Sequence, residues 1–238
     1  MRKKIVNWLK KQVCTSGAKG IVLGLSGGID SAVVSALAKE AVGKNKVLAL
    51  ILPCYSQAQD REDALLVSRG LGITTKIVDL SAIYDIFIKG MPKGSELALA
   101  NLKPRLRMVT LYYFANTLNY LVCGTGNKSE LSVGYFTKYG DGGTDILPIG
   151  NLLKRDVRRL ARELKIPEKV ITKPPTAGLW AGQTDEGEMG ITYEELDGIL
   201  ERMEIKKKQV FPRAKVDKVA WMMKRSKHKR QGPVVCKI

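Results

Sequence analysis

The feature that most constrains this chain is an apolar segment that leads directly into a glycine turn. Residues 20–24 read GIVLG, and residues 25–31 read LSGGIDS. A strand, a glycine turn and the first turn of a helix together present unpaired backbone N–H groups, which bind phosphate. Gly27 and Gly28 carry no Cβ atom, so the backbone can bend there and approach an anion closely. The segment therefore predicts a phosphate-binding loop at the end of a strand.

Polar side chains complete this loop. Ser26 and Ser31 can donate hydrogen bonds to phosphate oxygens, whereas a bare phosphate would repel Asp30. The presence of Asp30 therefore predicts a Mg²⁺ ion between the carboxylate and the phosphate. No Gly-Lys-Ser/Thr follows the glycines, which excludes a Walker A loop. The alternative is a strand–helix turn that binds no ligand.

The length of 238 residues allows one large α/β domain, or one domain with an appendage. The chain has no run of about 18 apolar residues, so it predicts no membrane span. The N-terminal segment 1–11 is too polar for a signal peptide and fits an amphipathic helix. We therefore expect a cytoplasmic protein.

The charge and the cysteines narrow the classes of partner. A net charge of +17 attracts polyanions, either nucleic acid or nucleotides, although charge runs are most often solvated faces. The cysteines form no Cys-x-x-Cys pair, so zinc and redox motifs are unsupported and buried thiols in a reducing compartment are expected. They are Cys14, Cys54, Cys123 and Cys236.

Short apolar segments alternate with helical patterns along the chain. This alternation predicts an α/β fold with a doubly wound, mostly parallel sheet and helices on both faces. We expect strands over residues 20–25, 46–52, 74–78 and 120–124, and helices over residues 30–41, 57–69, 97–118, 154–164, 193–201 and 215–224. Gly43 can end the first of these helices in the left-handed conformation. Residues 108–115 are apolar nearly all round, which indicates deep burial or a subunit interface.

Further motifs follow the loop in a fixed order. The most specific is FTKYGDG at residues 136–142, and the others lie at residues 101–108, 124–130, 145–148, 153–155, 173–177, 182–190 and 228–233. With the Ser-Gly-Gly-x-Asp-Ser loop, which resembles that of the ATP pyrophosphatases, these blocks make the chain similar to NAD synthetases over about residues 20–233. Pro104 stands where a helix-favouring residue is expected, so a helix could begin there with proline in its first turn.

The resemblance implies a ligase that amidates nicotinic acid adenine dinucleotide (deamido-NAD) to NAD, with ATP, Mg²⁺ and ammonia. It implies a homodimer, and membrane or nucleic-acid partners are not expected. The first expected strand already begins at Gly20, so we expect one domain over residues 1–238, no N-terminal glutaminase domain, and the ammonia-dependent form.

The resemblance also assigns residues to ligands. The ATP phosphates would be held by Gly24, Leu25, Ser26, Gly27, Gly28, Ile29, Asp30 and Ser31, and further ATP contacts would come from Thr125, Lys154 and Thr176. The Mg²⁺ ligands would be Asp30 and Glu130, although Glu130 alone could simply be a first-turn glutamate of a helix. Deamido-NAD would contact Arg105, Lys138, Asp145, His228 and Lys229.

The chemistry implied is activation of a carboxylate. The nicotinate carboxylate attacks the ATP α-phosphate, which releases pyrophosphate, and ammonia then displaces AMP from the acyl-adenylate. Such chemistry depends on positioning and charge neutralisation more than on a protein nucleophile. Asp141 could bind ammonium and help deprotonate it, or it could cap its own tight turn. The polar segment 182–188 is a candidate lid.

Two other functions compete with this interpretation. The same loop could serve a pyrophosphatase that acts on tRNA, and the charge of +17 favours nucleic acid. However, no Cys-x-x-Cys pair is present for a thiolase, and little chain is left for a tRNA-binding domain. A non-catalytic nucleotide-binding protein would be expected to lack Asp30 or Glu130, and both are present.

Overall fold

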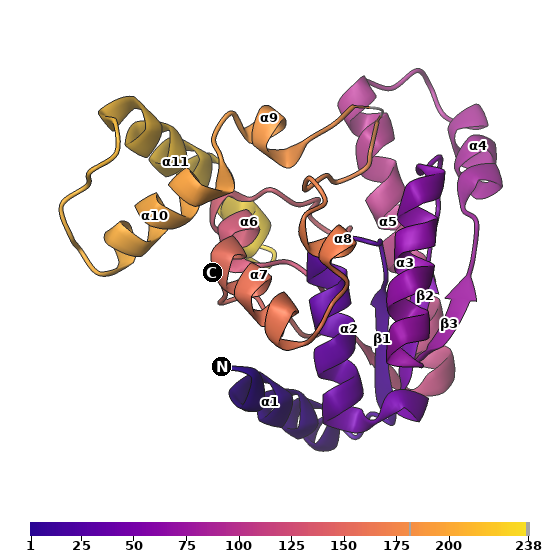
Figure 1. Ribbon diagram of the computed structural model, residues 1–238. Coiled ribbons are helices and arrows are strands. Elements are labelled where there is room, and N and C mark those ends of the chain that lie inside the picture. Colours follow the sequence, from indigo (N-terminus) through magenta and orange to yellow (C-terminus); the bar gives the residue numbers. More distant parts are fainter. Residues whose placement is uncertain (181, 237–238) are drawn as a thin grey trace.

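The computed structural model describes residues 1–180 and 182–236. Within them, one four-stranded sheet has the strand order β3-β2-β1-β4. Figure 1 shows β1, β2 and β3 of this sheet among the helices at the right. All three strand pairings are parallel, which confirms the predicted α/β class. The strands are β1 (Gly20–Gly24), β2 (Val47–Ile51), β3 (Thr74–Ile77) and β4 (Tyr120–Val122).

The sheet is covered on both faces because its two inner strands are apolar in both directions. Successive side chains of a strand point to opposite faces. Ile21 and Leu23 of β1 therefore join one core cluster, whereas Val22 joins another. The first cluster contains residues of α1 (Arg2–Thr15), α2 (Ile29–Val42), α3 (Ala58–Leu71), α7 (Lys154–Glu163) and α8 (Glu168–Ile171). The second contains residues of α4 (Ser81–Lys89) and α5 (Glu96–Leu118).

A third core cluster lies among helices that follow the last strand. It joins α6 (Lys128–Val133), α9 (Asp185–Met189), α10 (Tyr193–Glu204) and α11 (Arg213–Arg225). In Figure 1, α10 and α11 extend away from the sheet at the left. Two short 3₁₀ helices complete the elements, η1 (Lys44–Lys46) and η2 (Lys227–Arg230). Tyr193, at the start of α10, is fully buried within this cluster.

Several local predictions need correction. The helix around Pro104 does not begin at the proline: it begins at Glu96, where the Ser95 side chain accepts a hydrogen bond from Ala98 N, and Pro104 lies inside it. Gly43 ends α2 with φ +84° and ψ 152°, which is a positive-φ conformation but not the left-handed helical cap. Gly72, after α3, does adopt that cap.

Two expectations of burial are only partly met. Cys54 and Cys123 are buried, but Cys14 and Cys236 are exposed, because they lie at the end of α1 and in the C-terminal tail. The apolar segment 108–115 of α5 is not deeply buried throughout, since Val109 and Tyr113 are 60% and 67% exposed. Of the two predictions for residues 108–115, deep burial is therefore wrong for these side chains, and a subunit interface stays a prediction.

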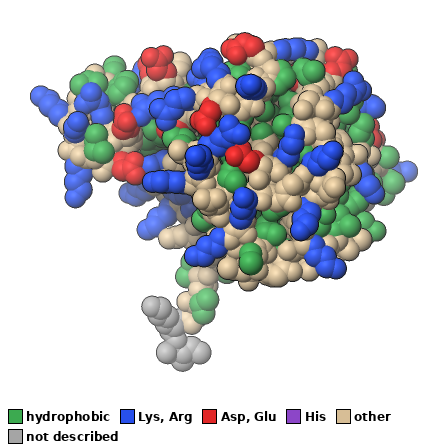
Figure 2. Space-filling model, turned by 60° about the horizontal axis from the view of Figure 1, so that its bottom comes forward, with side chains coloured by type: hydrophobic (Ala, Val, Ile, Leu, Met, Phe, Trp, Pro, Cys, Tyr) green, Lys and Arg blue, Asp and Glu red, His purple; other side chains and the backbone are tan. Residues whose placement is uncertain are grey.

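On the face drawn in Figure 2, the basic side chains are dispersed. Figure 2 shows Lys and Arg side chains spread over the visible face, with few acidic side chains among them. The net charge of +17 is therefore not confined to one patch on this face. No helix within the described residues is long and apolar enough to cross a membrane.

Candidate nucleotide-binding site

The candidate site lies where the strand order reverses. The chain runs from β1 to β2 and β3 on one side, and β4 then pairs with the other side of β1. Ligands of open α/β sheets bind at such a switch point, beyond the carboxyl ends of the strands. A cavity of about 760 Å³ opens here. The loop after β1 and the loop after β4 both line it, so segments far apart in sequence form one site.

The loop after β1 ends in a helix N-terminus that faces this cavity. Its turn is held by serine hydroxyls: Ser31 Oγ donates to Gly28 O at 2.9 Å and accepts from Ser26 N at 3.2 Å. Ala32 N makes the first intrahelical hydrogen bond of α2, to Gly28 O. The N–H groups before it belong to the open first turn, which carries the positive end of the helix dipole. This arrangement suits a phosphate.

The cavity includes most of the predicted loop residues but not all. Those that line it are Gly24, Leu25, Ser26, Gly28, Ile29, Asp30 and Ser31. Gly27 instead packs against α3, with φ +83°, where a Cβ atom would lie 2.3 Å from Asp60 O. Its role in the loop is therefore close backbone packing, which only glycine allows.

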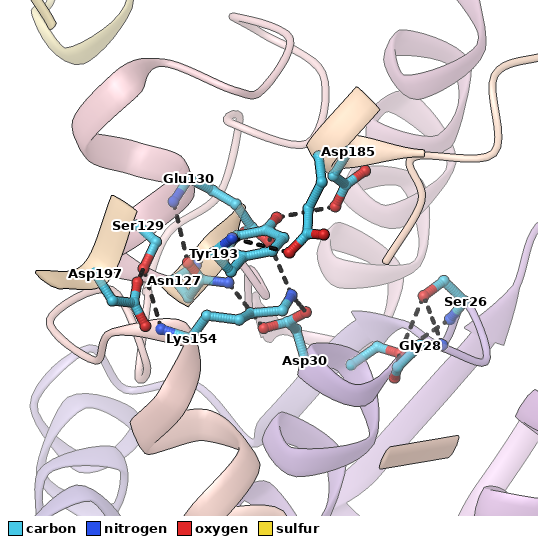
Figure 3. A network of polar contacts seen from close by, with 12 residues as sticks. Ser26, Gly28, Asp30, Asn127, Ser129, Glu130, Lys154, Asp185, Tyr193 and Asp197 are labelled. Carbon is cyan, nitrogen blue, oxygen red and sulfur yellow. Dashed lines mark hydrogen bonds and ion pairs between the residues drawn. The ribbon is translucent and has the colours of Figure 1, made fainter. Parts of the chain in front are cut away.

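The two predicted metal ligands converge on one ammonium group. Lys154 Nζ lies 2.5 Å from Asp30 Oδ2 and 3.2 Å from Glu130 Oε1. The Lys154 side chain is only 2% exposed. Asp30 comes from the start of α2 and Glu130 from α6, so the elements after β1 and β4 bring the carboxylates together, as Figure 3 shows.

Further polar groups fix these carboxylates in place. Asn127 Nδ2 donates to Asp30 Oδ1 at 2.9 Å, and the Asn127 side chain also forms a capping box with Glu130 at the start of α6. Tyr193 Oη lies 3.2 Å from Glu130 Oε1 and 2.9 Å from Asp185 Oδ2. Asp185 therefore joins the cluster through one buried hydroxyl (Figure 3).

A second set of hydrogen bonds positions the backbone of Lys154. Ser129 Oγ accepts from Lys154 N at 3.0 Å and donates to Asp197 Oδ1. Asp197 Oδ2 accepts from Arg155 N at 2.9 Å. Asp197 of α10 thus fixes the first turn of α7 relative to α6, so that the lysine and the two carboxylates share one frame.

The buried environment changes the proton affinities of the cluster. Burial raises the pKa of Glu130 to about 7, although the Lys154 ammonium opposes this shift. Burial disfavours the charged form of Lys154, but Asp30 and Glu130 outweigh it and raise the pKa of Lys154 above its ordinary value. Burial also raises the pKa of Asp185 and of Asp141. A raised carboxyl pKa favours the protonated form, so a cation that binds these carboxylates competes with that proton.

The oxygen donors of Asp30 and Glu130 are of the kind that Mg²⁺ prefers, and an ammonium already lies between them. The pair therefore fits a small divalent cation. The described residues contain no group of three or more His, Cys, Asp or Glu side chains arranged to hold a metal by themselves. A cation at this pair would thus need other ligands, such as phosphate oxygens or water.

The other predicted ligand contacts divide into two groups. Thr125, Lys154, Thr176, His228 and Lys229 line the cavity. Lys229 Nζ there donates to the carbonyl oxygens of Gly134 and Phe136, at 2.9 and 2.8 Å.

The remaining three contacts do not line the cavity: they are Arg105, Lys138 and Asp145. Asp145 accepts from Val122 N at 2.7 Å and from Tyr112 Oη at 2.9 Å. Lys138 Nζ donates to His228 O at 2.7 Å. Asp145 therefore supports the end of β4, and Lys138 supports the segment that carries His228.

Asp141 also lines the cavity, and its Oδ1 accepts from Thr137 N at 2.9 Å. This bond is the turn-capping interaction that the sequence allowed as the alternative to an ammonium contact. One carboxylate can do both, because each oxygen accepts more than one hydrogen bond.

The segment before α9 lines the cavity and is held at several points. Lys173 Nζ forms ion pairs with Asp60 at 2.8 Å and with Asp63 at 2.7 Å on α3. Lys103 Nζ donates to Leu179 O at 2.7 Å. Thr184 caps α9, so part of the predicted lid, residues 185–188, is helical.

Sequence reasoning assigned no role to four side chains of this site: Arg107, Asn127, Asp185 and Tyr193. Arg107 lines the cavity and donates to Leu52 O at 3.0 Å and to Ser56 Oγ at 3.2 Å. Asn127 could have been found from its spacing to Glu130, since Asn-x-x-Glu before a helix is a capping-box pattern. Asp185 and Tyr193 carry no local signal that relates them to the loop after β1.

Comparisons with known proteins show what the chain as a whole is similar to. The NH3-dependent NAD⁺ synthetase of Archaeoglobus fulgidus is 50% identical over 99% of this chain and 95% of that relative. A solved NMN synthetase from Francisella tularensis superposes with a TM-score of 0.92 and 39% identity, over 100% of this chain and 97% of that one. A solved NH3-dependent NAD synthetase from Campylobacter jejuni superposes with a TM-score of 0.86 and 32% identity, over 99% of this chain and 97% of that one. The NAD synthase family model matches residues 1–233, and the chain belongs to the NAD synthase family.

Proposed function

We propose that this chain catalyses the ATP- and Mg²⁺-dependent amidation of deamido-NAD to NAD with ammonia. The reaction passes through an acyl-adenylate and releases pyrophosphate and then AMP. The observation that carries the proposal is the convergence of Asp30 and Glu130 beside the phosphate loop, in a chain of the NAD synthase family. The names of the relatives support ammonia as the nitrogen source.

Residues of the loop would bind the ATP phosphates. The open first turn of α2, together with Ser26 and Ser31, offers donors to the anion. Asp30 and Glu130 would hold Mg²⁺, which neutralises phosphate charge during attack at the α-phosphorus. Thr125 and Thr176 would contact ATP from the edge of the cavity, and Lys154 would contribute a positive charge.

The acceptor would lie toward the part of the cavity that the C-terminal segment lines. His228 and Lys229 line the cavity there, and Lys138 supports this segment through the His228 carbonyl. Arg105, Lys138 and Asp145 would reach deamido-NAD only with a rearrangement or across a subunit interface. Asp141 would accept a proton from ammonium, since its buried carboxylate has a raised pKa.

A second acceptor is favoured by one observation. The Francisella tularensis structure, with a TM-score of 0.92, is named an NMN synthetase. The same chemistry would apply to nicotinic acid mononucleotide, because the reacting carboxylate and its pyridine ring are identical. The two acceptors differ in the adenylate half, so their relative rates report whether that half is bound.

The proposed assembly is a homodimer of single-domain chains. Exposed apolar side chains of α5 support it, because Val109 and Tyr113, which lie four residues apart on one face of the helix, are 60% and 67% exposed. Exposed apolar patches of this kind mark interaction surfaces. The cytoplasmic location stays a prediction from the sequence.

Pyrophosphate release with different acceptors tests the proposal. The purified protein is given ATP, Mg²⁺ and ammonium, with deamido-NAD, nicotinic acid mononucleotide or tRNA as the acceptor, and the amide product is measured by mass. We expect release that depends on one of the two nicotinate nucleotides, and a lower rate when glutamine replaces ammonium. Release that depends on tRNA, or ATP binding without release for any acceptor, would refute the proposal.

A further inference from the structure

The Lys154 ammonium lies where a divalent cation would have to bind. It is within 3.2 Å of both predicted ligands, and it also lies 4.8 Å from the centre of the Tyr193 ring. Mg²⁺ requires its oxygen ligands at about 2.0–2.1 Å in near-octahedral geometry. An ammonium and a dication compete for the same two carboxylate oxygens, because their charges repel at such distances. A cation that takes these two oxygens therefore displaces the lysine.

Asp185 offers the departing ammonium another partner. Its side chain is buried, with the residue only 5% exposed, and Oδ2 accepts from Tyr193 Oη. Its Oδ1 is buried and has no hydrogen-bond partner among the described residues. Buried polar atoms are nearly always paired, so an unpaired carboxylate oxygen beside a buried lysine is an acceptor awaiting a donor. Figure 3 shows Asp185 beside Tyr193, close to the carboxylates that Lys154 bridges.

The charges of the cluster support the same exchange. Asp30, Glu130 and Asp185 carry three negative charges when ionised, and Lys154 carries one positive charge. One divalent cation makes this cluster neutral only if Lys154 stays charged and stays close. Buried charges are tolerated when they are paired. The net charge of the cluster is therefore zero when one divalent cation is bound and the displaced Lys154 ammonium stays beside the ionised carboxylates.

We propose that Lys154 is a tethered cation that fills the metal position in the metal-free protein, and that Asp185 is a positioning residue that receives its ammonium when a divalent cation binds. This inference rests on the proposed divalent site at Asp30 and Glu130. It makes the lysine a competitor of the metal at that site.

The first test measures Mn²⁺ binding to the nucleotide-free protein by electron paramagnetic resonance. We expect Lys154→Met to bind Mn²⁺ at least about tenfold more tightly than the wild type, because its competitor is gone. Lys128→Met is the matched control, since it removes the same charge from the neighbouring α6, and it should change the affinity less than about threefold. Equal affinities for Lys154→Met and the wild type would overturn the inference.

The second test is a double-mutant cycle on Asp185. We expect Asp185→Asn to weaken Mn²⁺ binding about tenfold when Lys154 is present, and less than about threefold in the Lys154→Met background. If Asp185 had a purely structural role, Asp185→Asn would weaken Mn²⁺ binding equally in both backgrounds, and that result would overturn the inference. Glu188→Gln, which removes a charge from the same short helix, is the control and should leave the affinity within about twofold.

A Glu130→Gln variant distinguishes failure of the proposed metal site from failure of the proposed lysine exchange. If Glu130→Gln does not weaken Mn²⁺ binding, the proposed metal site itself is wrong. If Glu130→Gln weakens binding but the Lys154 and Asp185 variants do not alter it as stated, the metal site stands and the exchange is refuted. If Lys154→Met does not fold, the comparison of Asp185→Asn with Glu188→Gln decides, and equal affinities refute the exchange.

Discussion

Replacing Gly27 by alanine should damage both the fold and the nucleotide site. Gly27 has φ +83°, and a Cβ atom there would lie 2.3 Å from Asp60 O, 3.1 Å from Ala64 N and 3.1 Å from Asp63 Cβ. The nearest of these atoms belongs to the backbone of α3, so no rotamer change can relieve the contact. Either the loop or the helix must move.

The expected loss of unfolding free energy in Gly27→Ala has two contributions. A left-handed conformation costs a non-glycine residue about 1–2 kcal/mol. The backbone contact adds to this, so we expect a total loss of at least about 3 kcal/mol, within the range of severe single substitutions. For a chain of this size, each kcal/mol lowers Tm by about 2–4 °C, which gives about 6–12 °C. Gly72→Ala is the matched control: Gly72 has φ +63° and nothing within 4 Å of its Cβ position, so about 1 kcal/mol is expected.

Urea unfolding followed by circular dichroism measures the stability, and calorimetric titration with ATP measures the site. We expect Gly27→Ala to bind ATP at least about tenfold more weakly, because the displaced loop misaligns the N–H groups of α2. Gly72→Ala should bind ATP as the wild type does, since it lies at the far end of α3. The reasoning would be refuted if Gly27→Ala matched Gly72→Ala in both stability and ATP affinity.

Three further predictions concern chemistry, pH and assembly. Asp141→Asn should retain ATP–pyrophosphate exchange but lose amidation at least about 100-fold, and full amidation would exclude the ammonia role. Burial raises the pKa of Glu130 to about 7. The metal-free protein should therefore lose stability as pH rises from about 4.3, the unfolded value, towards 7, and a Glu130→Gln variant that kept the same slope in urea titrations would contradict this. Val109→Asp should convert a dimer to monomers in sedimentation velocity, whereas Ile205→Asp, at a similarly exposed position after α10, should not; a dimeric Val109→Asp would move the interface elsewhere.

The sheet and the phosphate loop could be predicted because their signals are local. Each strand is a short apolar run beside a helical pattern, so the order of elements follows directly from the sequence. A strand, a pair of glycines and a helix start all fall within the single segment 20–31. These features need no knowledge of distant contacts, and the structure confirms the strand positions within about two residues.

The failures have two physical causes. At Pro104 one local signal overrides another, because the Ser95 side chain caps α5 at Glu96, close to the start of the helix expected over residues 97–118, and the buried proline remains inside the helix. The other cause is distance along the chain. Tyr193 and Asp185 complete the carboxylate cluster from segments that lie far beyond Glu130 in the sequence. Their position depends on how α9 and α10 pack on α6, which no short window of sequence encodes.

A family resemblance indicates which residues contact a ligand, but it does not indicate which side chains those residues contact before the ligand binds. Lys154 was assigned to ATP, yet in this structure two carboxylates assigned to the metal hold it. All three assignments are compatible if the lysine, the metal and the phosphate exchange partners during binding, as proposed above. Motif order cannot show such an exchange, because it gives the same residues in every state. The motif at residues 182–190 contains Asp185, but only the side-chain contacts show that its Oδ1 has no hydrogen-bond partner among the described residues, and the proposed exchange is argued from that contact pattern.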